Sequence, residues 1–271
     1  WGEFRLLALD GTTVNLPNWK ALREHFGSAK NGKSWRAQAR MVMLQFPLAR
    51  LPFRYELGTL AEGERAVASR LLAGLCRNDL VLMDQGFWSY RLFWQVDQQQ
   101  AYFAIRRSAQ AHFRTVAKLG PKDRLVEWRP SDSRQRRGLP ESMRLRVIDY
   151  QIKGFRPTGI VTNVLDPARI PREAWIHLAT KEDEGRLRLA QGLYHRRWEI
   201  ETSFFELKVT QGMETHLRSR TPEGIAYEVA GHVLLYFLVR WLMVEAAATE
   251  NADPLRISFK GALDELLDMA P

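Results

Sequence analysis

Two short apolar runs, each followed at once by an aspartate and a nearby glycine, organise the first part of the chain. The apolar run from Phe4 to Ala8 ends at Asp10, and Leu80 to Met83 leads into Asp84. Short apolar runs bounded by turn residues are typical of strands that are buried on both faces. We therefore predict two central strands of an α/β sheet, each of which ends by placing a carboxylate at the sheet edge.

The residues between and after these runs predict a pair of antiparallel strands and two helices. Apolar positions alternate imperfectly from Arg36 to Phe46, and an extended pattern follows from Arg50 to Leu57. Apolar residues recur at helical spacing from Glu62 to Leu75. A second helix is expected through Gln95, with Ser89 in the capping position that serine favours.

From residue 101 to residue 170 the pattern consists of short alternating runs separated by turn residues such as Gly120-Pro121 and Gly138. Such a pattern is typical of strands and hairpins. We predict a β-rich insertion at 101–170 that separates the first part of a core, residues 1–100, from its second part, residues 171–271.

The second part of the core is predicted to be helical. Thr221 followed by Pro222 has the residue preferences of a helix start, and this helix is expected to run to Thr249. Its most apolar run, Val229 to Val239, is shorter than the roughly twenty residues that a membrane span requires. We therefore predict a buried helix, followed by a short amphipathic helix from Phe259 to Met269.

One earlier helical stretch, Leu187 to Lys208, combines an apolar and a polar stripe. On a helix of 3.6 residues per turn, Tyr194, Arg197 and Lys208 all lie within roughly 40° of Glu201. The apolar stripe beside them consists of Leu189, Leu193, Ile200, Phe204 and Leu207. The opposite side carries Arg196, Glu199, Ser203 and Glu206. The first polar stripe is therefore expected at the edge of a core, within reach of a substrate. The alternative is a surface ion pair between Arg197 and Glu201 that contributes a few tenths of a kcal/mol.

The distribution of charge adds a candidate partner. The net charge is +9, and residues 101–156 hold fourteen Lys or Arg against five Asp or Glu, while the remainder of the chain balances at 26 and 26. A basic block in an otherwise neutral chain favours a polyanion, most often nucleic acid, over a merely solvated surface. The candidate contacts to a DNA backbone are Arg106, Arg107, Arg134, Arg136 and Arg137. The run from Arg134 to Arg137 fits a disordered loop equally well.

The single cysteine, Cys76, excludes an internal disulfide and is typical of a reducing compartment. The first residues show no basic segment followed by an apolar one, so no signal peptide is predicted. The six histidines do not have the spacing of zinc ligands.

The three acids Asp10, Asp84 and Glu201 form the candidate chemistry. Clustered carboxylates repel one another unless a cation neutralises them, and their hard oxygen atoms select Mg²⁺ or Mn²⁺. Two such ions stabilise the attacking and leaving oxygens in phosphoryl transfer. A metal-free structural domain would leave the placement of these acids unexplained.

Three blocks of the sequence resemble the insertion-sequence-four family of DDE transposases. The spacing Tyr194-x₂-Arg197-x₃-Glu201-x₆-Lys208 matches the family's YREK signature. LALDGTT at 7–13 resembles the block of the first aspartate, and LVLMDQGFWS at 80–89 resembles the second. The resemblance extends from Arg5 to about Trp241, and the three blocks occur in the family's order.

This resemblance implies a ribonuclease-H-like mixed sheet flanked by helices, with the β-rich insertion before the helix of the glutamate. It implies that Asp10, Asp84 and Glu201 are catalytic and hold two Mg²⁺ or Mn²⁺ ions. Tyr194, Arg197 and Lys208 would contact transposon-end DNA. The implied activity is metal-dependent endonuclease cleavage of the element end, followed by attack of the 3′-hydroxyl on target DNA. We expect a bacterial cytoplasmic protein associated with the nucleoid, and a dimer or larger assembly when DNA is bound.

The chain departs from the family at two points. Gln85 stands where the family commonly has Arg. The sequence also opens on the first catalytic strand, so we expect a catalytic region without the N-terminal region that helps to bind the element ends. Trp198 lies on the other flank of Glu201, where it would either stack on a base or belong to the edge of the core.

Two other functions agree with the same residues. The first is a ribonuclease-H-like nuclease or resolvase that cuts DNA without joining it. The second is an inactive transposase relic that only binds DNA, against which the presence of all three acids argues.

Overall fold

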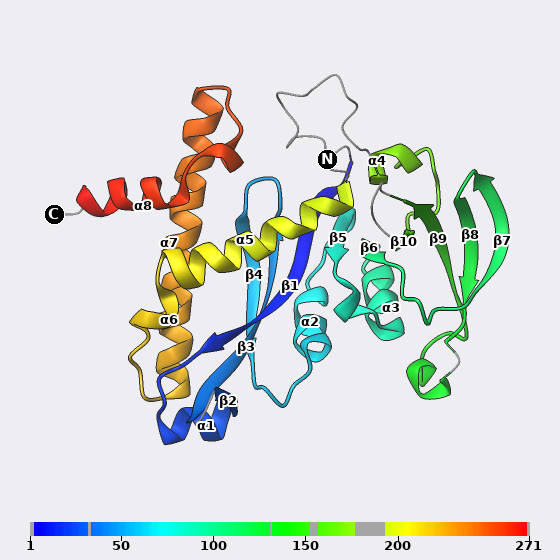
Figure 1. The fold of residues 1–271 in the computed structure, drawn as a ribbon. Helices are drawn as coiled ribbons and strands as arrows, with labels where there is room; N and C mark the ends of the chain where they lie inside the picture. The colour runs from blue at the N-terminus through cyan, green and yellow to red at the C-terminus, as the bar shows by residue number, and fades with distance from the viewer. Residues whose placement is uncertain (1–2, 32–33, 131, 152–156, 177–192, 270–271) are drawn as a thin grey trace. The chain divides into compact units, whose positions relative to one another are not determined.

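A computed structural model of the chain describes residues 3–31, 34–130, 132–151, 157–176 and 193–269. The chain is mixed α/β, with strands of a mixed sheet and flanking helices (Figure 1). It forms two compact units. Unit 1 comprises Trp1–Leu9 and Leu72–Arg197, and unit 2 comprises Asp10–Leu71 and Trp198–Pro271. Strand β1, Arg5–Asn15, contributes its first residues to unit 1 and the remainder to unit 2.

The parallel strands of unit 1 confirm the two predicted central strands. Residues Arg5–Leu9 pair in parallel with β5, Asp79–Met83, and β5 pairs in parallel with β6, Tyr102–Arg106. All residues of β5 are buried, as its continuous apolar sequence predicts. The last pair of this register joins Leu9 to Met83, and Met83 also faces Ile105 of β6.

Beyond β6 the sheet of unit 1 becomes antiparallel, and the predicted β-rich character of 101–170 is confirmed. The further strands, in the order in which they pair from β6, are β10 (Thr158–Thr162), β9 (Met143–Tyr150), β8 (Asp123–Trp128) and β7 (Phe113–Gly120). The helices of unit 1 are α3 (Tyr90–Gln98) and α4 (Arg172–Ile176), with one-turn 3₁₀ helices at Gln85–Phe87 (η1) and Ser133–Arg136 (η2). Ser89 caps α3 as predicted, because its hydroxyl accepts a hydrogen bond from the amide of Leu92.

The sheet of unit 2 is built around β3, Ser34–Phe46. This strand pairs antiparallel with β4, Leu51–Gly58, and with β2, Ser28–Asn31, and it also neighbours β1. The predicted antiparallel pair is thus confirmed. The prediction that the first strand ends at Asp10 is wrong, because β1 continues through Asn15 beside β3, and Val14 is buried there. The order in which the strands pair agrees with the ribonuclease-H-like mixed sheet that the family resemblance implies.

The helices of unit 2 include the predicted C-terminal pair. They are α1 (Lys20–Phe26), α2 (Glu64–Leu72), α5 (Glu199–Phe205), α6 (Met213–His216), α7 (Pro222–Thr249) and α8 (Phe259–Asp268), with a π-helix, η5, at Glu206–Thr210. Thr221 caps α7 by accepting a hydrogen bond from the amide of Gly224, and Pro222 occupies the first turn, as predicted.

Helix α7 is only partly the buried helix that the sequence predicts. Val229, Val233 and Tyr236 of its inner face are buried, whereas Leu234 and Leu238 are exposed. By length and composition α7 would be able to cross a membrane, a property that the core helices of soluble proteins share. Helix α7 therefore packs on the other elements of unit 2 through one face only.

A buried charged network joins three segments of unit 2. The carboxylate of Glu206 pairs with Arg240 of α7, accepts a hydrogen bond from the Tyr236 hydroxyl at 2.8 Å, and pairs with Arg50 at 3.0 Å. Arg50 also pairs with Glu199 at 2.7 Å. Burial raises the pKa of the Tyr236 phenol, so the phenol remains a hydrogen-bond donor to Glu206.

The network makes a testable prediction for Glu206. Glu206→Gln keeps the shape of the side chain but leaves the guanidinium groups of Arg50 and Arg240 with one carboxylate fewer. Removal of one partner from a buried charged pair typically costs about 3–5 kcal/mol, and we expect that loss in the free energy of unfolding measured with urea. Glu265→Gln, on the exposed side of α8, is the matched control and should change stability by less than about 0.5 kcal/mol. Equal free energies of unfolding for the two variants would contradict the proposed contribution of the network to stability.

Candidate functional site

Asp84 follows β5 directly and begins a tight turn. Its carboxylate caps the 3₁₀ helix Gln85–Phe87 by accepting a hydrogen bond from the amide of Gly86. A Cβ at Gly86 would lie 3.0 Å from the same carboxylate oxygen. The glycine two residues after Asp84 therefore has a steric reason, because a side chain there would displace the carboxylate. The side chain of Gln85 donates to the carbonyl of Arg107 at 3.3 Å, which ties this turn to the basic block of unit 1.

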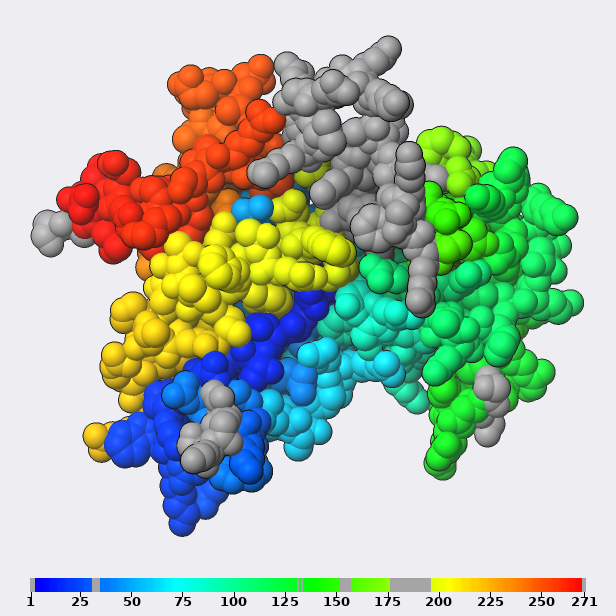
Figure 2. Space-filling view, viewed as in Figure 1, coloured from blue at the N-terminus to red at the C-terminus, as the bar shows by residue number. Residues whose placement is uncertain are grey.

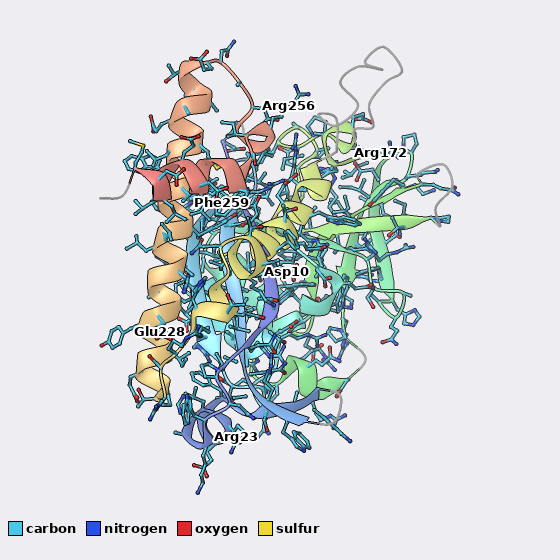
Figure 3. The ribbon with its side chains drawn as sticks, turned by 60° about the vertical axis from the view of Figure 1, so that its left-hand side comes forward. Asp10, Arg23, Arg172, Glu228, Arg256 and Phe259 are labelled. Carbon is cyan, nitrogen blue, oxygen red and sulfur yellow. The ribbon has the colours of Figure 1, made fainter. Side chains whose placement is uncertain are left out.

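Asp10 and Glu201 both belong to unit 2. The carboxylate of Asp10 accepts a hydrogen bond from the amide of Gly11 at 2.8 Å, and the side chain is half-buried on β1 (Figure 3). Glu201 is exposed in the first turn of α5.

The donor set fits a hard divalent cation, because all three candidates offer carboxylate oxygens. Among the residues that the structure describes, however, no three or more His, Cys, Asp or Glu side chains form a group that would hold a metal ion. The convergence of Asp10, Asp84 and Glu201 on such an ion therefore stays a prediction.

The prediction of one regular α-helix from Leu187 to Lys208 is wrong in its geometry. Residues 187–192 lie outside the described part of the chain, and Leu193–Trp198 forms a 3₁₀ helix. Only Glu199–Phe205 is α-helical, and the next five residues form the π-helix η5. A hydrogen bond of 2.7 Å from the amide of Gln211 to the carbonyl of Glu206 closes the wide turn.

Two polar side chains differ from their predicted positions. Ser203 and Glu206, expected on the far side of the helix, are both buried. Arg50 and Arg240 pair with the carboxylate of Glu206, and the hydroxyl of Ser203 donates to the carbonyl of Glu199 at 3.0 Å, so both buried groups have partners. The apolar positions Ile200, Phe204 and Leu207 are buried as predicted.

The signature residues before the glutamate differ in exposure. The side chain of Tyr194 lies outside what the structure describes. Arg197, the last residue of unit 1, is only 5% exposed, whereas Trp198, the first residue of this part of unit 2, is 51% exposed. Trp198 thus offers much of its ring to solvent within its own unit.

Lys208 links η5 to β1 through hydrogen bonds. Its ammonium group donates to the carbonyl of Thr13 at 2.6 Å and to the hydroxyl of Thr12 at 3.3 Å, and it pairs with Glu214 at 3.1 Å. Figure 2 shows the α5–η5 residues, in yellow, against the blue residues of β1. The segment that follows Asp10 is therefore tied to the helix that carries Glu201.

Three residues that sequence reasoning missed, Asn15, Gln38 and Glu214, complete this link. Glu214 accepts hydrogen bonds from the amide of Asn15 at 3.1 Å and from its side-chain nitrogen at 2.8 Å. Gln38 of β3 in turn donates to the side-chain oxygen of Asn15 at 2.9 Å. No spacing rule connects residues 15, 38 and 214, so only the fold reveals them.

The arginines of the predicted DNA-binding block differ in their surroundings within unit 1. Arg106 is exposed at the end of β6, while Arg107 pairs with Asp149 at 3.0 Å. Arg134 is highly exposed and pairs with Asp132 at 3.1 Å, an interaction that lowers the pKa of that carboxyl group. Arg134 and Arg136 belong to η2 and Arg137 follows it, so this run is a short 3₁₀ helix in the described chain.

Comparison with known proteins adds a family and two relatives. The family described as a transposase DDE domain matches residues 1–238. The transposase InsG for insertion sequence element IS4 of Escherichia coli (strain K12) is 29% identical over 255 residues, which cover 91% of this chain and 54% of that protein. A cryo-EM structure of a piggyBac transposase synaptic complex with hairpin DNA has a TM-score of 0.48 at 8% identity, covering 97% of this chain and 51% of that one. The chain spans about half the length of these relatives.

The Lys208 network predicts an effect on stability in the absence of DNA. Lys208→Met keeps the length of the side chain but removes the donor to Thr13 and the partner of Glu214. Because hydrogen bonds that involve charged groups contribute more than neutral ones, we expect a loss of about 1–2 kcal/mol in the free energy of unfolding. Lys260→Met removes an exposed ammonium that pairs with Asp264 and serves as the control, with an expected change below about 0.5 kcal/mol. An unchanged stability of Lys208→Met would show that the ammonium has no structural role.

Proposed function

Because the chain belongs to the transposase DDE domain family, we propose that it is the catalytic region of a DNA transposase. The observation that supports this most directly is the parallel register that pairs Leu9 with Met83. The next residues along the two strands are Asp10, within β1, and Asp84, directly after β5, so each of the paired strands supplies one acid just past the last paired residues. A helix that presents Glu201 would complete the set.

In this proposal Asp10, Asp84 and Glu201 hold two Mg²⁺ or Mn²⁺ ions. When bound, the ions supply charge stabilisation to the attacking and leaving oxygens of a phosphodiester. Water first cleaves one strand at the element end and releases a 3′-hydroxyl, which then attacks a phosphodiester of target DNA. The protein contributes positioning and electrostatic stabilisation, and a covalent protein–DNA intermediate is not required.

The proposed partners are transposon-end and target DNA. Tyr194, Arg197 and Lys208 would flank the scissile phosphate, and Trp198 would offer its exposed ring for stacking. For Lys208 this role requires exchange of its present contacts for a phosphate. The basic insertion at 101–170 would follow the DNA backbone through Arg106, Arg107, Arg134, Arg136 and Arg137. We further propose that the chain acts in the bacterial cytoplasm at the nucleoid, as a dimer or larger assembly on DNA.

A nuclease or resolvase without strand transfer is the second candidate. It uses the same carboxylates for the first step and lacks the second. A strand-transfer assay with labelled element ends separates the two, because joined products arise only if the 3′-hydroxyl attacks a second duplex.

The three acids generate the central test. Asp84→Asn and Glu201→Gln preserve shape and remove one charged ligand each, so we expect the rate of Mg²⁺- or Mn²⁺-dependent cleavage of an end-bearing duplex to fall by about a hundredfold or more. Asp268→Asn, at the exposed last residue of α8, is the matched control and should cleave at the wild-type rate. Cleavage at the wild-type rate by Asp84→Asn or Glu201→Gln would contradict the proposal that these carboxylates hold the catalytic metal ions.

The basic block generates a separate test on DNA affinity. Arg106→Glu combined with Arg134→Glu reverses two exposed charges of unit 1. Each phosphate contact that is lost lowers the slope of log K against log salt by about 0.9, so we expect weaker binding with a slope that is shallower by up to about 2. Arg256→Glu combined with Lys260→Glu, near the start of α8, is the control with equal charge change. The same affinity and slope as wild type would show that the block is a solvated surface only.

A further inference from the structure

A groove of about 530 Å³ opens in unit 2 beside the Lys208 network. The loop after β1 forms one wall through Asn18 and Trp19, and the segment around α6 forms the other through Glu214 and Arg218. Arg36 of β3 also lines it. Neither the family match nor the charge count along the chain assigns a function to this groove.

Arg218 lines the groove, and its guanidinium group donates to the carbonyls of Thr215 at 2.6 Å and Leu217 at 3.1 Å. Two further arginines contact residues that line it. Arg23 of α1 donates to the carbonyl of Asn18 at 2.6 Å. Arg220 lies over the ring of Trp19, 4.3 Å from its centroid. Such contacts orient the guanidinium groups but do not neutralise them.

Other arginines of the chain are held differently. Arg5 pairs with Asp79 at 2.6 Å and Arg146 with Asp123 at 2.5 Å, so a carboxylate offsets each positive charge. At the groove, the lining carboxylate of Glu214 is already shared with Lys208, and its charge is offset there. The positive charge of the groove is therefore available to an external anion.

An exposed tryptophan lies among these cations. Trp19 lines the groove, is 42% exposed, and carries the guanidinium of Arg220 over its ring. An exposed indole ring beside oriented cations provides the stacking surface and phosphate partners that nucleic-acid-binding proteins use.

We propose that this groove binds the sugar–phosphate backbone of DNA beside the stretch that the candidate site processes. The inference rests on the proposed function and adds a second contact region to it. Continuity with the candidate site supports DNA as the occupant, because Glu214 both lines the groove and holds Lys208. Pre-oriented guanidinium groups lose little conformational freedom on binding a phosphate, which favours them as fixed backbone contacts.

The first experiment compares charge-reversed variants on fluorescein-labelled, mixed-sequence duplex DNA. Arg36→Glu combined with Arg218→Glu should weaken binding at least about tenfold and lower the salt slope by up to about 2. Arg36→Glu alone tests the same groove without touching the Arg218 contacts that shape the α6 turn, and it should keep the wild-type melting temperature. Arg256→Glu with Lys260→Glu again provides an equal change of charge and should leave binding close to wild type.

The second experiment concerns the ring of Trp19, which lines the groove. Trp19→Ala should reduce affinity several-fold, and Trp19→Phe, which retains a stacking face, should restore most of it. Wild-type binding by both charge-reversed variants and by Trp19→Ala would overturn the groove proposal. Metal-dependent cleavage, and with it the proposed function, would still stand. Absence of DNA binding by the wild-type chain would instead remove both.

Discussion

The buried carboxylate of Glu206 is the interaction on which unit 2 depends. It compensates the guanidinium of Arg240 on α7 and that of Arg50, which adopts a left-handed backbone conformation in the turn before β4. A non-glycine residue in that conformation persists only where its surroundings determine it, and here two carboxylates do so. One side chain thus fixes the position of the π-helix relative to α7 and to the turn between β3 and β4.

The π-helix is the local consequence of this anchoring. A regular α-helix would keep the polar residues of the signature on one stripe, but the wide turn that begins at Glu206 lets that residue face the core while Lys208 reaches Thr13 of β1. Irregular helices of this kind are frequent at functional sites, where a fixed side-chain position matters more than a regular hydrogen-bond pattern. The segment after Asp10 and the helix of Glu201 are consequently held together by contacts within unit 2.

The charge that a surface presents depends on the partners of its arginines as well as on how many arginines it has. The basic excess of 101–156 lies in unit 1, yet several of its arginines are paired, such as Arg107 with Asp149. Acidic and basic residues are nearly equal in number over unit 2 as a whole, but the contacts of Arg23, Arg218 and Arg220 are carbonyl oxygens and an indole ring. The proposed DNA contact in unit 2 therefore rests on the partners of these arginines and not on the net charge of the unit.

Sequence alone determined most of the elements and the family. Buried runs specify β5 and the first half of β1, the alternation after residue 101 specifies the antiparallel strands, and Ser89 and Thr221 specify helix starts, because each of these signals is local. The candidate acids were found in the same way, from strand ends and a spaced signature. Tertiary structure alone decided that β1 continues to Asn15, that the signature helix is 3₁₀, α and π in turn, and that Glu206 is buried. It also linked Glu214 to Asn15 and Lys208. These features depend on partners about 30 to 200 residues away, and no local pattern of apolar and polar positions encodes which distant side chain will arrive.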